Sequence, residues 1–170
     1  MQQKLLSRFE RDMQLRGLSA LTQEAYLRSV RRFADFLGKS PQKATARDVK
    51  RYLHDLMSKR HLTKQTVNQH AAALRLLFTV TLNKSWARNQ IPTAKTAKKL
   101  PEVLSGEEVL RVLRAFDSVK HRTIAVLCYG AGLRINEALH LKVKDIDSQP
   151  GLIHVRQGKG QKDREVPLSP

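Results

Sequence analysis

The sequence of 170 residues lacks the features of a secreted or membrane protein. No apolar stretch approaches the roughly 18 residues that a membrane span needs. Charges run through the N-terminal segment MQQKLLSRFERDM, which therefore cannot serve as a signal peptide. A single cysteine, Cys128, excludes an internal disulfide framework and suits a reducing cytoplasm. With hydrophobic residues at 41%, the composition favours an ordinary globular protein of one large domain or two small ones.

Common catalytic and metal-binding motifs are missing as well. The six histidines form no His-Glu-x-x-His pattern, and the sequence contains no Gly-x-Ser-x-Gly nucleophile motif. Gly158–Gly160 lacks the spacing and the Ser or Thr of a Walker phosphate-binding loop. Asp145 and Asp147 are close in sequence, but they are expected in a loop that enters a strand. We therefore expect no metal ion and no other cofactor, and a hydrolase function is disfavoured.

Acidic residues are scarce, above all in the middle of the chain. Lys and Arg number 32 against 15 Asp and Glu, which gives a formal net charge of +17. The 46 residues between Asp55 and Glu102 hold nine bases and no acid. A protein this basic most often binds a polyanion, and nucleic acid is a better candidate than an anionic membrane surface.

Hydrophobic periodicity predicts four helices in the first half, at about residues 5–16, 22–37, 46–56 and 63–83. Thr45 suits the N-cap of the third helix, and Gly38 ends the second. The fourth helix has an apolar face, and its opposite face carries Lys64, Gln65, Asn68, Gln69 and Arg75. Residues 1–86 are therefore predicted to form a small helical bundle.

Residues 87–101 are predicted to be a basic linker, because they contain two prolines and no hydrophobic periodicity. Such a segment is either a solvated tether or a strap along a phosphate backbone. In the second case Lys98 and Lys99 would neutralise phosphates and release counterions.

Residues 102–170 have a mixed helix and strand pattern. A capping box, Ser105–Glu108, starts one helix, residues 123–132 suggest a buried helix that breaks at glycines, and a short helix follows. The strand-like runs LIHVRQ and REVPL flank a turn rich in Gly and Lys, so they predict a β-hairpin. Two strands alone leave an open edge, which suggests a domain that is cut short.

Two stretches of this half combine cations with glycine. Arg134 follows a glycine-rich break at a helix start, where the N-terminal pole favours anions, and Glu137 could hold its guanidinium. An ordinary surface ion pair explains this pattern equally well. In the hairpin turn, Lys159 lies between two glycines, and Lys162 and Arg164 extend the positive patch. A solvated turn is the alternative there.

Together these stretches resemble the tyrosine recombinase (phage integrase) family. LCYGAGLRINEALHLKVKDID is similar to the family's first catalytic box, and IHVRQGKGQKDREVPLSP to its catalytic hairpin, especially that of integron-type integrases. GLSALTQEAYLRSVRRFADFL and LTKQTVNQHAAALRLLF resemble the helical core-binding domain. The resemblance implies a mainly α fold, in which a four-helix SAM-like domain and the linker precede an incomplete α+β catalytic domain with a β-hairpin.

The resemblance also implies roles for individual residues. Arg134 would hold a non-bridging oxygen of the scissile phosphate, Glu137 would support it, and Lys159 would protonate the leaving 5′ oxygen from the minor groove. Such cations serve phosphoryl transfer without a metal ion. The second and fourth helices would face double-stranded DNA at an inverted-repeat site. The expected DNA contacts are Lys64, Gln65, Asn68, Gln69, Arg75, Lys98, Lys99, Lys162 and Arg164.

The family's nucleophilic tyrosine has no counterpart in this sequence. Members continue with a His-x-x-Arg box, a further His or Trp and the tyrosine, all of which would lie beyond Pro170. Tyr26, Tyr52 and Tyr129 precede the arginine box. We therefore expect a chain truncated before the nucleophile and unable to cleave DNA alone. We also expect a monomer, although family members form tetramers on DNA, and a place in the bacterial cytoplasm with the nucleoid.

Three functions remain open at this point. The first is DNA binding within site-specific recombination or integration. The second is a catalytically inert regulatory module that occupies recombination sites. The third is a basic protein that binds RNA or a membrane surface, which predicts an amphipathic helix with a basic face. The amides of the fourth helix suit adenine edges in the major groove better.

Overall fold

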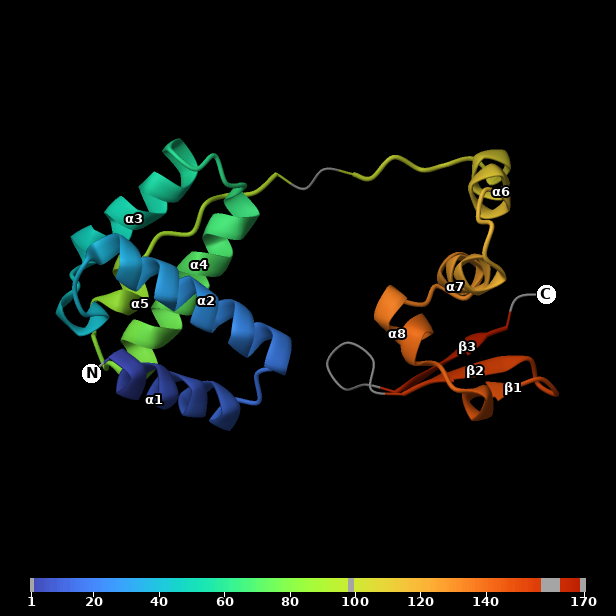
Figure 1. The fold of residues 1–170 in the computed structure, drawn as a ribbon, viewed down its shortest axis with the longest axis horizontal. Coiled ribbons are helices and arrows are strands. Elements are labelled where there is room, and N and C mark those ends of the chain that lie inside the picture. Colours follow the sequence, from blue (N-terminus) through green and yellow to red (C-terminus); the bar gives the residue numbers. More distant parts are fainter. Residues whose placement is uncertain (1, 98–99, 157–162, 169–170) are drawn as a thin grey trace. The chain divides into compact units, whose positions relative to one another are not determined.

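A computed structural model describes residues 2–97, 100–156 and 163–168 of the chain (Figure 1). The chain divides into two compact units, Met1–Lys99 and Leu100–Pro170. The first unit is helical, and the second combines helices with an antiparallel sheet. The predicted fold class, mainly α with a hairpin in the second half, is confirmed.

The first unit is built from helices that follow the predicted order. The fourth predicted helix is α-helical only to Leu76, and the backbone then forms a π-helical turn over Leu77–Thr81. Gly38 ends the second helix in the left-handed region, with φ of 62°. The helices are α1 (Gln2–Leu15), α2 (Ala20–Leu37), α3 (Ala46–Ser58), α4 (Lys64–Leu76) and α5 (Ala87–Gln90).

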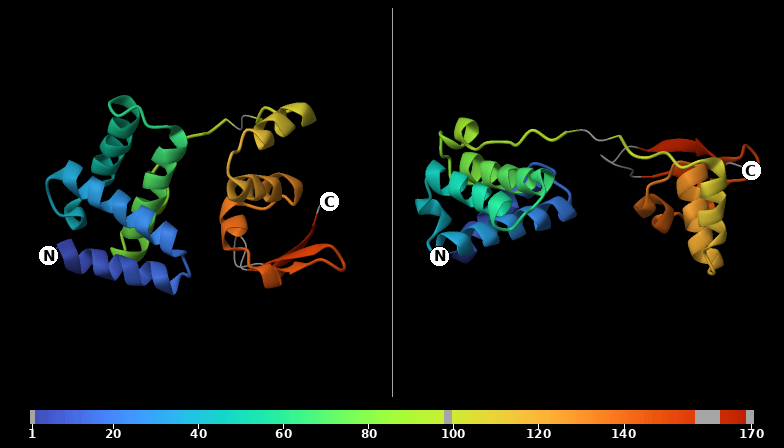
Figure 2. Two further views of the ribbon diagram at one scale, coloured as in Figure 1. Left: turned by 45° about the vertical axis from the view of Figure 1, so that its right-hand side comes forward. Right: turned by 90° about the horizontal axis from the view of Figure 1, so that it is seen from above.

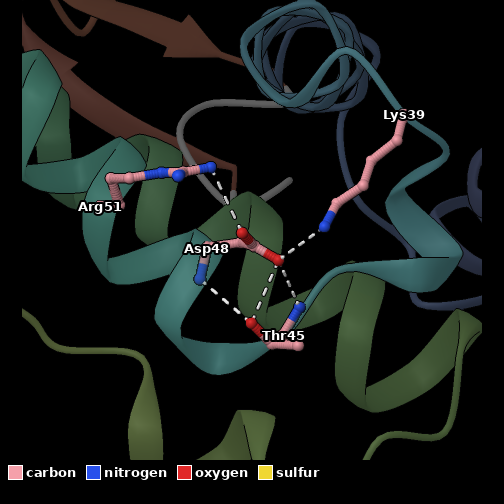
Figure 3. Close-up of polar contacts among 4 residues, drawn as sticks. All are labelled: Lys39, Thr45, Asp48 and Arg51. Carbon is pink, nitrogen blue, oxygen red and sulfur yellow. Dashed lines mark hydrogen bonds and ion pairs between the residues drawn. The ribbon is translucent and has the colours of Figure 1, made fainter.

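The start of α3 is fixed by a reciprocal cap (Figure 3). Thr45 Oγ1 accepts the Asp48 N–H at 3.3 Å, and Asp48 Oδ2 accepts the Thr45 N–H at 3.0 Å. Lys39 and Arg51 lie 3.2 and 3.4 Å from the same carboxylate. The Thr45 N–H, followed by Lys39, holds the pKa of Asp48 below its usual value. The sequence therefore identified this helix start correctly.

The core of the first unit is large and aromatic. Phe33 is fully buried and meets the rings of Tyr52 and Phe78 edge-on at centroid distances of 5.1 and 6.0 Å. Ala87 and Ile91 are buried in the same cluster. The segment predicted as a linker, 87–101, thus begins with residues that belong to the helical core.

The second unit contains short elements. The hairpin predicted from the sequence consists of β2 and β3, which pair in antiparallel register with Val155 opposite Arg164. A third strand of two residues pairs with the other edge of β2, so the sheet order is β1-β2-β3. The elements are α6 (Gly106–Arg114), α7 (Val119–Gly130), α8 (Ile135–His140), β1 (Ile146–Asp147), β2 (Leu152–Val155) and β3 (Arg164–Pro167).

The core of the second unit is small. Leu133, just before α8, and Ala138, within it, pack with Ile153 and Val155 of β2. The ribbon views show α8 and the sheet of this unit (Figure 1, Figure 2). The helix predicted over 123–132 is present as α7, but the prediction that it is buried was wrong, because no residue of α7 is buried. α7 contacts this core along one side only, and Tyr129 on it is 63% exposed.

Candidate functional site

Arg134 stands at the first turn of α8, where the local backbone fixes its position. Gly132 adopts a φ of 62°, which an L side chain would strain, and Leu133 anchors the turn in the core. The Arg134 side chain is 56% exposed. Its Nη1 donates to Glu137 Oε1 at 2.9 Å, and its backbone N–H donates to Glu137 Oε2 at 2.8 Å. The start of α8 is therefore capped by a carboxylate of the chain itself.

Arg164 reaches the same carboxylate from β3. It stands opposite Val155 in the register, so both side chains share the sheet face that is turned toward the core. Arg164 Nη1 donates to Glu137 Oε1 at 2.9 Å, and Nη2 donates to Oε2 at 2.7 Å. This pairing is bidentate, an arrangement that adds both strength and geometric specificity to an arginine–carboxylate interaction.

Glu137 is thereby held as an anion between two arginines. Its side chain is only 9% exposed. Hydrogen bonds from Arg164, then from the Arg134 N–H, hold its pKa far below the usual value against the opposing effect of burial. In return, Glu137 raises the pKa of Arg164. Glu137 thus carries no proton near neutral pH, and it acts as a fixed negative charge that orients cations.

Arg134 keeps donors for a further acceptor. Within the described parts of the chain, Glu137 is the hydrogen-bond partner of its side chain, and that contact uses Nη1. The remaining N–H groups of an exposed guanidinium can bind a phosphate oxygen. Lys159 and Lys162, the other cations predicted for this site, lie outside the described residues.

Further cations surround the hairpin. A groove beside β2 and β3 is lined by Lys144, His154, Arg156 and Arg164, among other residues. Arg156 forms an ion pair with the buried Asp145, with 3.1 Å between Nε and Oδ1. The groove therefore mixes cations with the acids Asp163 and Glu165, and His154 lies 3.2 Å from Glu165.

The polar face of α4 carries side chains that are exposed and side chains that bind another part of the chain. Lys64, Gln65 and Gln69 are exposed. Asn68 instead binds the chain that leaves α5: its Nδ2 donates to Ala94 O at 2.9 Å, and its Oδ1 accepts the Ala94 N–H at 2.8 Å. Sequence reasoning had grouped Asn68 with the free amides of this face.

Arg75 also holds this segment against α4. Its Nη2 donates to Ile91 O at 2.7 Å and to Thr93 Oγ1 at 2.9 Å. The stretch of residues 91–94 is therefore attached along the helix, and no local pattern in the sequence signals this contact. Lys98 and Lys99 lie outside the described residues.

The described residues offer neither a metal-binding cluster nor a membrane-spanning helix. No group of three or more His, Cys, Asp or Glu side chains is arranged to hold a metal ion in that part of the chain. Among the helices described, none has the length and apolar character needed to cross a membrane.

Comparison with known proteins assigns both units. Residues 5–88 match the family model of the phage integrase N-terminal SAM-like domain, and residues 102–170 match that of the phage integrase family. The protein y4qK of Sinorhizobium fredii, which carries an integrase/recombinase name, is 44% identical over 167 residues, covering 98% of this chain and 54% of the relative. Tyrosine recombinase XerA of Pyrococcus furiosus is 35% identical over 168 residues, covering 97% and 56%. The chain thus spans about half the length of these relatives.

Solved structures share the fold. A lambda integrase tetramer bound to a Holliday junction aligns with a TM-score of 0.68 at 19% identity, covering 98% of this chain and 50% of that one. The Tn1549 transposon integrase in complex with circular intermediate DNA aligns with a TM-score of 0.65 at 22% identity, covering 97% and 60%.

Proposed function

Because the chain belongs to the phage integrase family of tyrosine recombinases, we propose that it binds double-stranded DNA at a site of recombination or integration. The observation that carries the proposal is the exposed Arg134 guanidinium, held in place by the buried carboxylate of Glu137. Because the side chain is already ordered, it loses less conformational entropy when it binds a phosphate.

Arg134 would bind the non-bridging oxygens of one DNA phosphate. Phosphoryl transfer places negative charge on these oxygens, and fixed cations stabilise that charge. Glu137 lies behind the guanidinium and carries a permanent negative charge, so it orients Arg134 without taking part in proton transfer. Lys159, which lies between Val155 and Arg164 in the sequence, would supply the proton for the leaving oxygen.

The helical unit would supply recognition of the duplex. Gln65 and Gln69 are exposed on α4, and their amides can pair with adenine edges in the major groove. Lys64 next to them would contact a phosphate. Asn68 and Arg75 would act indirectly, by holding residues 91–94 along α4.

We further propose that the 170-residue chain forms no covalent bond with DNA by itself. Tyr52 is fully buried, its hydroxyl lies 3.1 Å from His70 Nδ1, and burial raises its pKa to about 12. Tyr26 packs against the core of the first unit, and Tyr129 precedes Arg134 on α7. A nicked suicide duplex incubated with the purified chain should yield no covalent adduct, and an adduct mapped to any of these tyrosines would contradict this proposal.

Selection from random duplexes tests the binding proposal. The immobilised chain is offered a pool of random sequences at a salt concentration of about 150 mM, where screening suppresses weak electrostatic binding. We expect enrichment of one sequence motif, and we expect the variant with Gln65→Ala and Gln69→Ala to lose that enrichment. Recovery of the input pool without enrichment would contradict sequence-specific binding.

A further inference from the structure

Arg164 is 30 positions from Arg134 in the sequence, yet both side chains bind the same carboxylate. We propose that Arg164 is a positioning residue that sets the orientation of Arg134 through Glu137. The inference rests on the proposed function only in assigning a phosphate to Arg134. It replaces the direct DNA contact that the sequence suggested for Arg164.

The geometry of the carboxylate supports this role. Oε1 of Glu137 accepts from one guanidinium N–H of each arginine, and Oε2 accepts from the Arg134 backbone and from Arg164 Nη2. Two parallel hydrogen bonds from Arg164 fix the plane of the Glu137 carboxylate. The orientation of this plane determines where Oε1 accepts the hydrogen bond from Arg134 Nη1. Without Arg164, the flexible Glu137 side chain regains rotational freedom and no longer holds one orientation.

The position of Arg164 in the sheet explains why it does not point to a ligand. Its side chain shares a face with the buried Val155, is 33% exposed, and uses both of its Nη atoms on Glu137. The same contact ties β3 to α8. Arg164 begins β3, so its bonds to Glu137 link this strand to the helix whose start carries Arg134.

The test uses the full chain and follows the Arg134 side chain by NMR. The Nε–Hε signal of Arg134 is recorded with and without inorganic phosphate, and the carboxyl carbon of Glu137 is titrated with pH. The variants are Arg164→Met, which removes both bonds, and Arg164→Lys, which keeps the charge but loses the fork. Arg156→Met is the matched control, because it removes one arginine of the same hairpin that pairs with Asp145 instead.

We expect one ordered Arg134 signal in the unaltered chain and in Arg156→Met. In Arg164→Met the signal should broaden or average, the pKa of Glu137 should rise toward its usual value, and phosphate should bind Arg134 about three- to tenfold more weakly. Arg164→Lys should give effects between those of the unaltered chain and those of Arg164→Met. In a Glu137→Gln background, Arg164→Met should add no further effect.

The outcomes separate the two proposals. An Arg134 signal that is unchanged in both Arg164→Met and Arg164→Lys, with the amide spectrum intact, would overturn the positioning role. An equal loss of phosphate binding with and without Glu137 would do the same, since Arg164 would then contact the anion directly. If Arg134 responds to Arg164→Met but never to phosphate, the positioning role stands and the phosphate role of Arg134 fails. Should Arg164→Met prevent folding, Arg164→Lys gives the decisive reading.

Discussion

The two units of this chain are stabilised by different kinds of interaction. The helical unit surrounds a fully buried aromatic group, in which Phe33 contacts both Tyr52 and Phe78. The second unit buries few apolar side chains, and Arg134 and Arg164 form ion pairs with Glu137 there. Apolar burial itself does not depend on protonation, whereas ion pairs respond to pH and are screened by salt. Changes to the core should therefore affect the first unit most, and changes of charge the second.

The largest effect is expected from Phe33→Ala. Removal of a fully buried ring leaves a cavity and costs about 3–5 kcal/mol of unfolding free energy. Urea denaturation followed by the fluorescence of Trp86, which packs on Phe78 in the same core, measures this loss. Val126→Ala on the exposed side of α7 is the control and should leave the Trp86 midpoint unchanged. Equal effects of the two substitutions would remove the distinction between the units.

Glu137→Gln should have a smaller effect that is confined to the second unit. The neutral amide cannot accept charge-assisted bonds from both arginines, so α8 and β3 lose their connection. Hydrogen exchange of the amides in α8 and β3 should become faster, with no change in the Trp86 unfolding transition. The contribution of Glu137 is present above the usual pKa of Glu and is lost as the pH falls through its lowered pKa. If acid changed the protection of these amides equally in the unaltered chain and in Glu137→Gln, the result would contradict this prediction.

Two neighbouring amides on α4 provide a finer comparison. Asn68→Ala leaves the Ala94 backbone unpaired and should lower the unfolding free energy by about 1–2 kcal/mol. Gln65→Ala, on the exposed side, should change stability by less than about 0.5 kcal/mol but relax the preference for the selected DNA sequence. Urea denaturation and competition binding separate the two effects. The reverse pattern would show that Asn68 contacts DNA and that Gln65 holds the fold.

The smallest effect should appear in the dependence of the helical unit on pH. Burial, together with the positive charges of Arg32 and Arg60, lowers the pKa of His70. As the pH falls, His70 is protonated in the unfolded chain before it is protonated in the folded chain. Its contribution to the free energy of unfolding is therefore fully present above about pH 6.5 and declines below it. Trp86 denaturation curves between pH 7 and 5 should show the decline, and His70→Gln should flatten it. A decline of the same slope in His70→Gln would assign the effect to another group.

Local signals in the sequence predicted the starts of two helices, α3 and α6, and the hairpin. Thr45 forms the N-cap that its residue type indicated, and Ser105 and Glu108 form the capping box that their spacing indicated, because capping involves residues three positions apart. Contacts between distant residues were not predictable in this way. The two bonds between Asn68 and Ala94 span 26 positions, and no periodic pattern marks either residue as a partner.

The same limit applied to the second unit. Arg164 was grouped with the exposed cations of the hairpin, since only the strand register brings it opposite Val155 and toward Glu137. β1 has two residues, which is too short for an alternating pattern to be seen. The apolar run of α7 suggested burial, but exposure depends on what packs against a helix and not on its composition alone.

The central claim, that this chain reads DNA sequence, is tested most directly by a salt titration of binding. The affinity for a duplex of the selected sequence is compared with that for a scrambled duplex of the same length as salt increases. Our account predicts tighter binding to the selected duplex at about 150 mM salt, with both affinities falling by about 0.9 logarithmic units per phosphate contact for each tenfold rise in salt. Equal affinities for the selected and scrambled duplexes, both lost as salt increases, would contradict it. The chain would then be a basic protein that binds any polyanion.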